Sequence, residues 1–400
     1  SQVRDHYIDL RIESIFEKML SEWQPNLIHF QLCIGLSASL PQVAALYRIP
    51  HILTLHDYWY ICSRVQLLNR RGHICPGPIA NVDCQDCMFP DGFLQPFMRM
   101  WLFRILRSRL SEYSKRRIHR FLSQIAPSLP SRRPDMAPSP YLERDEYMLS
   151  LLGTVPLILA PSHFVKDLYV RHGVSEERLR VLPLGLELAP WTEAGFHAPG
   201  SGTCLRVGYL GSIIRHKGVH ILVKAFRRLQ TTGARLHICG LAEPGDPFTS
   251  HLRRLARHDS RIELIGRYQQ RDLPAILAKL DVIVIPSLWH ETFSIVAREA
   301  LLSGTPVIAS RIGALPEIIL DGQNGLLVEA GDEGALHHAL HRLSTEPGLL
   351  ARLSNGALAS SKQIKNMDDH AHEVDLLYES MVRLTAAHAG AHPPRTWVVT

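Results

Sequence analysis

Residues 207–226 read VGYLGSIIRHKGVHILVKAF. A short apolar run ends at Gly211, and after Gly218 the apolar residues recur at the spacing of an amphipathic helix. A strand, a glycine-containing turn and a helix, in that order, are the unit from which parallel α/β sheets are built. The unit recurs downstream, with strands expected at 205–210, 234–239, 261–265, 281–286, 306–310 and 325–329, and helices at 218–230, 248–257, 271–280, 294–303, 315–320 and 333–344. This alternation predicts a doubly wound α/β domain of Rossmann type.

The N-terminal half shows the same alternation with interruptions. After a first helical pattern, strands are expected in PNLIHFQ (25–31) and PHILTLHD (50–57), with a helix through Leu40–Tyr47 between them. LILAPSHFVKDLYVRHG (157–173) predicts a further strand, a helix that starts at a Pro-Ser pair, and a glycine stop. A Gly-, Pro- and Ser-rich stretch that ends near residue 202 marks the domain boundary.

Bulk properties place the chain among ordinary globular proteins. Its 400 residues allow two or three domains of about 150 residues each. Hydrophobic residues make up 46% and charged residues 20%, and no uninterrupted apolar run approaches the roughly 18 residues of a membrane span. The net charge of +6 favours anionic partners but discriminates poorly among them. Seven cysteines, an odd number, fit a reducing cytosol better than a disulfide framework.

Three loops that follow predicted strands share the character of an anion site. In a doubly wound sheet, ligands bind at the loops beyond the carboxyl ends of the strands. Gly211 allows close backbone approach, and Lys217 places an ammonium beside a helix N-terminus, where a phosphate is favoured. Glu291 and Glu299 belong to the second loop and its helix, and Gly313 precedes the helix of the third.

The two glutamates form an informative pair. Eight residues are just over two helical turns, so we expect both carboxylates on one face, about 12 Å apart along the axis. Each could then grip one set of hydroxyls of a sugar nucleotide, the ribose or the transferred sugar. The amides of Phe293, Ser294 and Ile295 would be free for the diphosphate. The alternative is a solvated pair of charges on a surface helix.

The segment 205–331 resembles the C-terminal domain of the family-4 retaining glycosyltransferases of GT-B fold, whose signature contains a Glu-x7-Glu motif. The matching residues are Pro286, Ser287, Glu291, Phe293, Ser294, Glu299, Ala300, Gly304, Pro306, Val307, Ile308, Ala309, Ser310, Gly313 and Glu317. DGQNGLLVEAGD (321–332) also resembles the family, and HILTLHDYWYIC (51–62) resembles its strand that brings a histidine to the cleft. Together the similar segments cover most of residues 25–335.

The resemblance implies an α/β GT-B fold in which two Rossmann-like domains face a cleft. Residues 1–200 would be the acceptor domain, with a Cys-rich insertion at 60–95, and residues 201–365 the nucleotide-sugar domain. A helix at 366–387 would pack back on the N-terminal domain, and 388–400 would be a tail. The first strand and glycine-rich loop of such a domain are expected before Ser1, so the N-terminal domain is expected to lack its first strands.

The resemblance also implies roles for single residues. Glu291 should hold the transferred sugar, Glu299 the ribose, Lys217 the diphosphate, and His56 should face the sugar across the cleft. The expected donor is a UDP- or GDP-sugar, the acceptor a glycan or a lipid-linked molecule of cell-surface glycan synthesis, and the enzyme a hexosyltransferase-like one. The family's reaction is drawn as front-face attack assisted by the donor's phosphate, so no cofactor is required for the chemistry.

The first loop departs from the family's pattern. Many members place an arginine directly after the glycine, where this chain has Ser212. Arg215 lies three residues further on and is the candidate for the second cation. The donor base is expected near GRYQ (266–269), with Tyr268 as the residue that stacks on it.

Cys62, Cys75, Cys84 and Cys87 have the spacing C-x12-C-x8-C-x2-C. Four thiolates that end in a C-x2-C knuckle fit a tetrahedral structural zinc. The loop has few apolar residues, so a metal would explain its order. The alternative is four free thiols or a transient disulfide.

The stretch 98–122 is basic and has apolar residues at near-helical spacing. Such a segment can lie on anionic lipid, and an ordinary helix with a solvated basic face is the alternative. We expect a cytoplasmic protein, with a peripheral position at the inner face of the membrane as a further expectation. No nucleic-acid recognition motif accompanies the charge. The rival to a working transferase is a noncatalytic nucleotide-sugar-binding or partner subunit.

Overall fold

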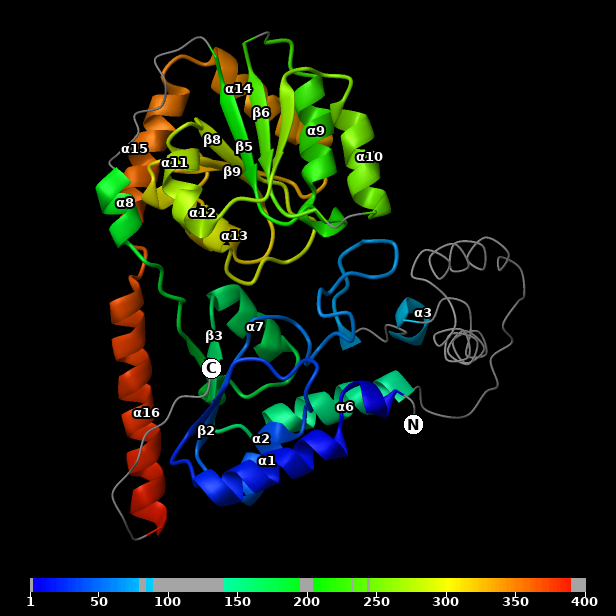
Figure 1. The fold of residues 1–400 in the computed structure, drawn as a ribbon, viewed down its shortest axis with the longest axis vertical. Helices are drawn as coiled ribbons and strands as arrows, with labels where there is room; N and C mark the ends of the chain where they lie inside the picture. The colour runs from blue at the N-terminus through cyan, green and yellow to red at the C-terminus, as the bar shows by residue number, and fades with distance from the viewer. Residues whose placement is uncertain are drawn as a thin grey trace, which may run out of the picture.

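The computed structural model describes residues 3–78, 84–88, 140–194, 204–231, 233–242 and 245–389. They form two α/β domains, with the long helix α16 (Met367–Ala389) running beside the N-terminal one (Figure 1). In the described residues, no helix is both long enough and apolar enough to cross a membrane. The basic stretch 98–122, predicted to be a helix, lies outside the described residues.

The N-terminal domain is built on a parallel sheet in the order β1-β2-β3-β4. Its register pairs Phe30 with Leu53 and Thr54 with Leu159. The predicted strands and helices of this half are present with slightly shorter bounds. The elements are η1 (Arg4–His6), α1 (Leu10–Trp23), β1 (Ile28–Phe30), α2 (Leu40–Leu46), β2 (His51–Thr54), α3 (Cys84–Met88), α6 (Pro140–Leu152), β3 (Leu157–Ala160), α7 (His163–Arg171), η3 (Glu176–Arg178) and β4 (Leu179–Val181).

The C-terminal domain is built on a six-stranded parallel sheet in the order β10-β9-β8-β5-β6-β7. Counted along the chain from β5, this is the Rossmann order 3-2-1-4-5-6. The order reverses between β5 and β8, which is where such sheets bind ligands. Its elements are β5 (Arg206–Leu210), η4 (Arg215–Lys217), α9 (Val219–Arg227), β6 (Arg235–Cys239), α10 (Pro247–Ala256), β7 (Ile262–Gly266), η5 (Gln270–Asp272), α11 (Leu273–Leu277), β8 (Val282–Ile285), α12 (Ile295–Leu302), β9 (Val307–Ser310), α13 (Leu315–Ile318), β10 (Gly325–Val328), α14 (Glu333–Thr345) and α15 (Leu349–Ser361).

The predicted alternation of strands and helices in this half is therefore confirmed. The two clearest differences lie at helix starts. The expected helix 271–280 is a 3-10 turn followed by the short α11, and α12 begins after Ser294, which is in the left-handed region at φ 59°. Apolar residues cover both faces of the sheet, with Phe226 of α9 in one core and Leu301 of α12 in the other.

Side-chain caps fix the starts of several helices. Ser162 accepts a hydrogen bond from the amide of Val165 at the start of α7, as its Pro-Ser pair predicted. Asp246 and Asp332 accept from the third residue beyond them and begin α10 and α14. These caps satisfy amides that a helix leaves without an internal partner.

The linker, which includes α8 (Ala189–Ala194), and α16 join the domains on one side of the molecule (Figure 1). The amide of Leu186 donates to the carbonyl of Lys365 at 3.0 Å, just before α16 begins. Leu377 of α16 packs with Ile52 of β2 and Leu159 of β3 in a small separate cluster. The chain thus returns to the first domain after completing the second.

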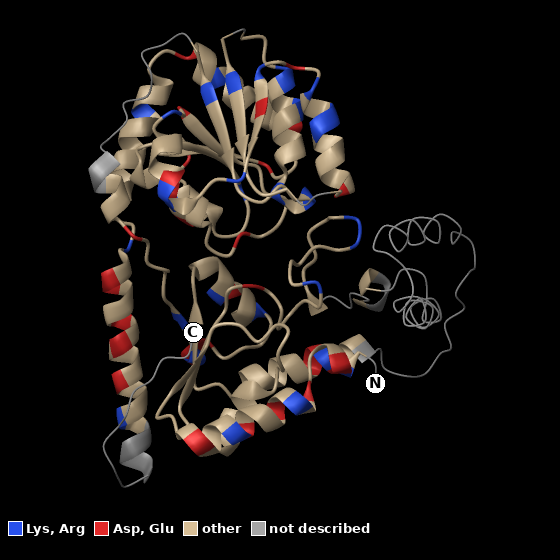
Figure 2. Cartoon of the chain, in the orientation of Figure 1, with Lys and Arg blue, Asp and Glu red and all other residues tan. Residues whose placement is uncertain are grey.

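Charge is distributed unevenly among the described elements (Figure 2). Arg253 and Arg254 lie in the last turn of α10. On α16, Asp368, Asp369 and Glu373 precede Arg383, the one Lys or Arg of that helix (Figure 2). The net charge of +6 therefore gives no indication of the local charge on α10 or α16.

Candidate functional site

The predicted site loops meet at the reversal of strand order. The loop after β5 holds Gly211 and Lys217, and the loop after β8 holds Glu291. Because β5 and β8 are parallel neighbours, both loops leave the same edge of the sheet. The amide of Leu288 donates to the carbonyl of His216 at 2.8 Å, which ties the two loops together.

The carboxylate of Glu291 lies at the centre of this arrangement and is only 5% exposed. The ammonium of Lys217 donates to both of its oxygens, at 2.8 and 3.1 Å. Its Oε1 also accepts from the hydroxyl of Ser287 at 2.5 Å and from the indole N–H of Trp289 at 3.0 Å. Three donors on one oxygen hold the carboxylate in a fixed orientation.

Trp289 connects this carboxylate to its surroundings through its ring. The ammonium of Lys217 lies 5.0 Å from the ring centroid, and the rings of His216 and Tyr58 contact it edge-on at 5.3 and 6.2 Å. Burial, together with the charge of Lys217, lowers the pKa of His216 to about 4. A neutral His216 therefore lies beside the Lys217–Glu291 ion pair at physiological pH.

Two glycines allow these loops to approach each other. Gly218 has φ +73°, and a Cβ there would lie 1.8 Å from the carbonyl oxygen of Pro286. Gly313 has φ +61°, and a Cβ there would lie 2.5 Å from both the amide nitrogen and the carbonyl oxygen of Glu291. The amide of Ala314 then donates to that carbonyl at 2.8 Å. A side chain at either glycine would displace the loop that carries Glu291.

The turn between Glu291 and α12 presents three backbone amides. Within the described residues, the amides of Phe293, Ser294 and Ile295 donate to no carbonyl or side chain. They lie at the start of α12, where the helix dipole adds partial positive charge. This arrangement suits an anion with several oxygens.

Glu299 lies in α12 and is 4% exposed. Burial raises the pKa of its carboxyl, and the hydrogen bond from the side-chain amide of Gln270 opposes that shift. Tyr268, from the same loop as Gln270, packs against the core behind it, and burial followed by the charge of Glu299 raises the pKa of its phenol to about 12. The loop after β7 therefore provides neighbours for Glu299.

The expectation that the eight residues from Glu291 to Glu299 follow helical spacing was wrong, although Glu291 does lie just before the helix that carries Glu299, as expected. Glu291 belongs to the loop, Ser294 breaks the helical path at φ 59° and ψ 84°, and Glu299 is the fifth residue of α12. Because only the second half of this spacing is helical, the helical rise per residue does not give the distance between the two carboxylates.

Gly211, Ser212 and Arg215 lie in the loop after β5. The amide of Gly211 donates to the carbonyl of Cys239 at 3.1 Å, and the carbonyl of Ser212 accepts from the hydroxyl of Tyr209 at 2.7 Å. The side chains of Ser212 and Arg215 are exposed. Arg215 makes no ion pair within the described residues, so its guanidinium is available to a ligand.

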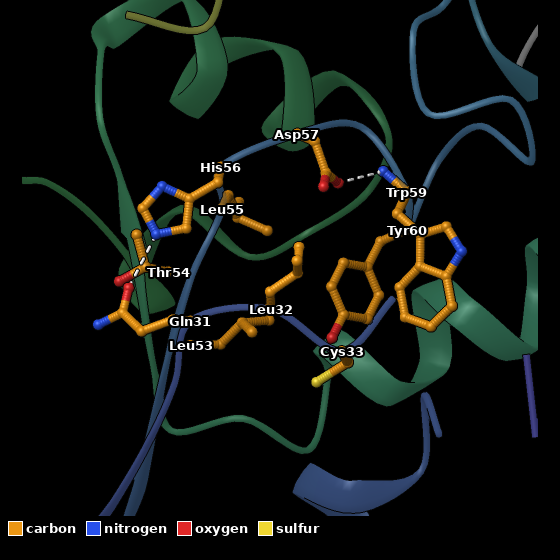
Figure 3. Close-up of a pocket in the computed structure, with 10 residues that line it drawn as sticks. All are labelled: Gln31, Leu32, Cys33, Leu53, Thr54, Leu55, His56, Asp57, Trp59 and Tyr60. Carbon is orange, nitrogen blue, oxygen red and sulfur yellow. Dashed lines mark hydrogen bonds between the residues drawn. The ribbon is translucent and has the colours of Figure 1, made fainter. Parts of the chain in front are cut away.

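His56 comes from the N-terminal domain, in the loop after β2. It lines a pocket with residues of the loop after β1, and its Nε2 lies 2.8 Å from Oε1 of Gln31 (Figure 3). Burial lowers the pKa of His56. Asp57 beside it accepts from the amide of Trp59 at 2.8 Å, and burial raises the pKa of its carboxyl (Figure 3).

The His56 loop and the start of α7 both contact the C-terminal domain. The hydroxyl of Tyr58 donates to the carbonyl of His290 at 3.0 Å, and that of Ser162 donates to the carbonyl of Thr292 at 2.7 Å. The carboxylate of Glu317 accepts from the amides of His163 and Phe164, at 3.1 and 2.6 Å. The loop around Glu291 is thus held by both domains.

The structure does not support the zinc prediction. Within the described residues, no three His, Cys, Asp or Glu side chains form a group that could hold a metal ion, and all four cysteines are free. The premise that this loop buries little was also wrong, because Tyr60, Ile61, Leu67 and Leu68 belong to the buried interior of the domain. Burial raises the pKa of Cys62 and brings that of Cys84 to about 12, which favours the thiol form.

Two side chains of the site, Trp289 and Gln270, were not singled out from the sequence, and Ser287 was named only as part of the family's motif. Trp289 and Ser287 orient Glu291, and Gln270 orients Glu299. Trp289 lies two residues before Glu291, and a tryptophan in a polar loop was a usable signal. Gln270 carried no signal, because its contact with Glu299 depends on how the loop after β7 folds.

Comparisons with known proteins match the C-terminal domain to a family model and to curated relatives. Residues 204–346 match the family model of the glycosyl transferases group 1. The MMP alpha-(1->4)-mannosyltransferase of Mycolicibacterium hassiacum is 30% identical over 235 residues, which are 58% of this chain and 55% of that protein. The chain spans about half the length of the curated relatives it matches.

Solved structures resemble the chain over nearly its whole length. Sucrose-phosphate synthase from Thermosynechococcus elongatus has a TM-score of 0.59 at 19% identity and covers 94% of this chain and 78% of its own. Anabaena HepE in complex with UDP-glucose has a TM-score of 0.60 at 16% identity, with 92% and 82% covered. The chain has the GT-B fold, and together with the glycosyl transferases group 1 match of residues 204–346 this supports a glycosyltransferase.

Proposed function

We propose that the chain is a retaining glycosyltransferase of family-4 type that moves a sugar from a nucleotide-sugar donor to a lipid-linked or polysaccharide acceptor. The observation that carries the proposal is the buried Glu291 carboxylate, bound by Lys217 and followed by three backbone amides without partners in the described residues. An oriented carboxylate suits sugar hydroxyls, and a cation beside free amides suits a diphosphate. HepE, whose structure was solved with UDP-glucose, supports the donor class.

The proposed chemistry relies on positioning and charge. As the bond between the sugar and the diphosphate breaks, negative charge grows on the leaving phosphate. The ammonium of Lys217 and the amides of Ser294 and Ile295 would stabilise that charge. Glu291 already accepts three hydrogen bonds on one oxygen, so we assign it to holding hydroxyls rather than to proton transfer. The acceptor hydroxyl attacks the anomeric carbon on the face that the diphosphate leaves, and its proton passes to the departing phosphate oxygen. This retains the anomeric configuration.

The remaining roles follow from place in the fold. Glu299, with Gln270 beside it, would hold the ribose, and Tyr268 would stack on the base. His56, in the facing domain, would contact the transferred sugar. No step in this scheme needs a metal or an organic cofactor.

A second candidate is a donor-binding subunit without turnover. Ser212 favours it, because many family-4 enzymes have an arginine there and the serine removes a cation from the diphosphate site. The two candidates agree on donor binding and differ in turnover.

The test is calorimetric titration of the protein with UDP-, GDP- and ADP-sugars, followed by assay of glycosyl transfer. Glu299→Ala should lose binding, whereas Glu329→Ala, which removes an exposed glutamate of the same domain, should retain it. Transfer with the donor's anomeric configuration supports the retaining enzyme, and binding without transfer to any acceptor tested supports the second candidate. No binding of any nucleotide sugar would overturn both.

A further inference from the structure

Arg298 is a buried cation that none of the proposed roles uses. It lies in α12 directly before Glu299 and is 8% exposed. Within the described residues it makes no ion pair, and the more distant carboxylate of Glu317 is the charge that opposes the effect of burial on its pKa. Burying a charge without a close partner is costly. Burial lowers its pKa to about 10, so the guanidinium remains charged at neutral pH. The contacts of this guanidinium therefore indicate its role.

The guanidinium holds the turn that precedes α12. Nη1 of Arg298 donates to the carbonyl of Phe293 and, at 3.3 Å, to the carbonyl of Ser294. Its central carbon lies 3.4 Å from the centroid of the Phe293 ring. Ser294 adopts φ 59° and ψ 84°, a conformation that is unfavourable for a residue with a side chain. The two hydrogen bonds stabilise this turn from its inner side.

The direction of the carbonyls fixes the direction of the amides. In a planar trans peptide, the N–H of one residue points opposite to the C=O of the residue before it. Because Arg298 binds the carbonyls of Phe293 and Ser294, the amides of Ser294 and Ile295 are turned away from Arg298. These are two of the three amides that donate to nothing within the described residues.

We propose that Arg298 is a positioning residue of the diphosphate site, which aims the amides of Ser294 and Ile295 at the phosphates and adds positive charge from behind the turn. This inference rests on the proposed function. Arg298 does not touch the donor in this arrangement, and its charge acts through the peptide units that it polarises. The start of α12 adds to the same positive potential.

Arg261 is the natural comparison within the chain. It also donates to two carbonyls, those of Leu229 and Thr231, at 2.7 and 3.1 Å, and lies 5.1 Å from the centroid of the Phe226 ring. Asp259 neutralises it at 2.7 Å, and it precedes β7, at the opposite edge of the sheet from the site. Arg261 thus binds backbone carbonyls as Arg298 does, but its charge is neutralised by Asp259.

The experiment measures Kd for UDP, GDP and ADP, each beside its nucleoside, in the wild type, Arg298→Met, Arg298→Lys and Arg261→Met. Arg298→Met should weaken binding of the recognised nucleoside diphosphate by about 10- to 100-fold, the effect of a charge-assisted hydrogen-bond set, and leave the nucleoside nearly unchanged. Arg298→Lys keeps the charge and should recover part of the loss. Arg261→Met should bind both ligands as the wild type does.

Each outcome decides the matter. Equal weakening of diphosphate and nucleoside in both Arg298 variants, or unchanged binding in them, would overturn the inference and leave donor binding intact. If Arg298→Met does not fold, as judged by its thermal transition, Arg298→Lys provides the test alone. The ratio of its Kd for the nucleoside diphosphate to its Kd for the nucleoside is then compared with that of the wild type, and an equal ratio counts against the proposal. A wild type that binds no nucleoside diphosphate would instead overturn the proposed function, and the inference with it.

Discussion

The two sides of the domain boundary are built by different means. On the C-terminal side, Glu291 accepts hydrogen bonds from three side chains, and Gly313 lies against its backbone. On the N-terminal side, His56 is oriented by the exposed side chain of Gln31. On the proposed donor side, a buried ion pair and close backbone contacts therefore fix the position of Glu291. On the facing side, an exposed side chain orients His56, so the position of this imidazole is less firmly fixed. Four predictions test that contrast, beginning with the largest expected effect.

Lys217→Ala should have the largest effect. It removes the ion pair of Glu291 and the cation proposed for the leaving phosphate, so we expect the rate of sugar transfer to fall by about 10²- to 10³-fold. His56→Ala should cost less, about tenfold. Lys279→Ala removes an exposed lysine of the same domain and serves as the control. Steady-state kinetics with saturating acceptor measures all three, and equal losses for Lys217→Ala and His56→Ala would contradict the contrast.

Gly313→Ala tests the backbone approach. The new Cβ would meet the backbone of Glu291, so we expect the free energy of unfolding to fall by about 2–4 kcal/mol and donor binding to weaken. Gly322→Ala is the matched control, because Gly322 has φ +73° and open space around its Cβ position. That variant should lose only about 1 kcal/mol. Urea denaturation measures both, and similar losses would show that the close contact at Glu291 is unimportant.

Glu317→Ala tests how firmly the two sides are joined. Its carboxylate accepts from the first two amides of α7, and losing such a cap typically costs about 1 kcal/mol. Because the contact crosses the domain boundary, we expect the two domains to unfold at more widely separated temperatures. Calorimetry measures the transitions, with Glu329→Ala as the control. A single transition that is merely shifted would argue against a role between the domains.

Acid should weaken the junction between α16 and the N-terminal domain. Nδ1 and Nε2 of His29 lie 2.8 and 2.7 Å from the hydroxyls of Tyr378 and Thr54, and burial is the main cause of its pKa of about 4. The unfolded chain, with a pKa near 6.5, binds the proton first as pH falls, so stability is lost between about pH 6.5 and 4. The loss at pH 5 is on the order of 1–2 kcal/mol.

His29→Gln should flatten this pH dependence while it lowers stability at neutral pH. Equilibrium unfolding at pH 7 and pH 5 measures the slope in both proteins. His216→Gln, on the other side of the boundary, removes a second histidine with a pKa of about 4 and should flatten the slope without loosening α16. An unchanged slope in His29→Gln would show that His29 does not carry the acid sensitivity.

Much of the site was predictable because it depends on local order in the sequence. The strand, the glycine turn and the start of the helix around Gly211 and Lys217 are set by neighbours within about ten residues. The sequence pattern therefore predicted the elements that the structure has there. The spacing argument failed between Glu291 and Glu299, because Ser294 leaves the helical region before α12 begins. The metal prediction failed for a similar reason, since cysteine spacing says nothing of the apolar residues that order the same loop.

The sequence by itself determined the alternation of elements, the parallel sheets and the loops that would carry the charged residues. These follow from hydrophobic periodicity, glycine and cap residues, which act over one or two turns of chain. Only the tertiary structure decided that Trp289 and Ser287 orient Glu291, that Gln270 reaches Glu299, and that Glu317 caps a helix of the other domain. The physical reason is that these contacts form only when separate loops or domains pack against each other. The spacing of residues within one segment does not determine that packing.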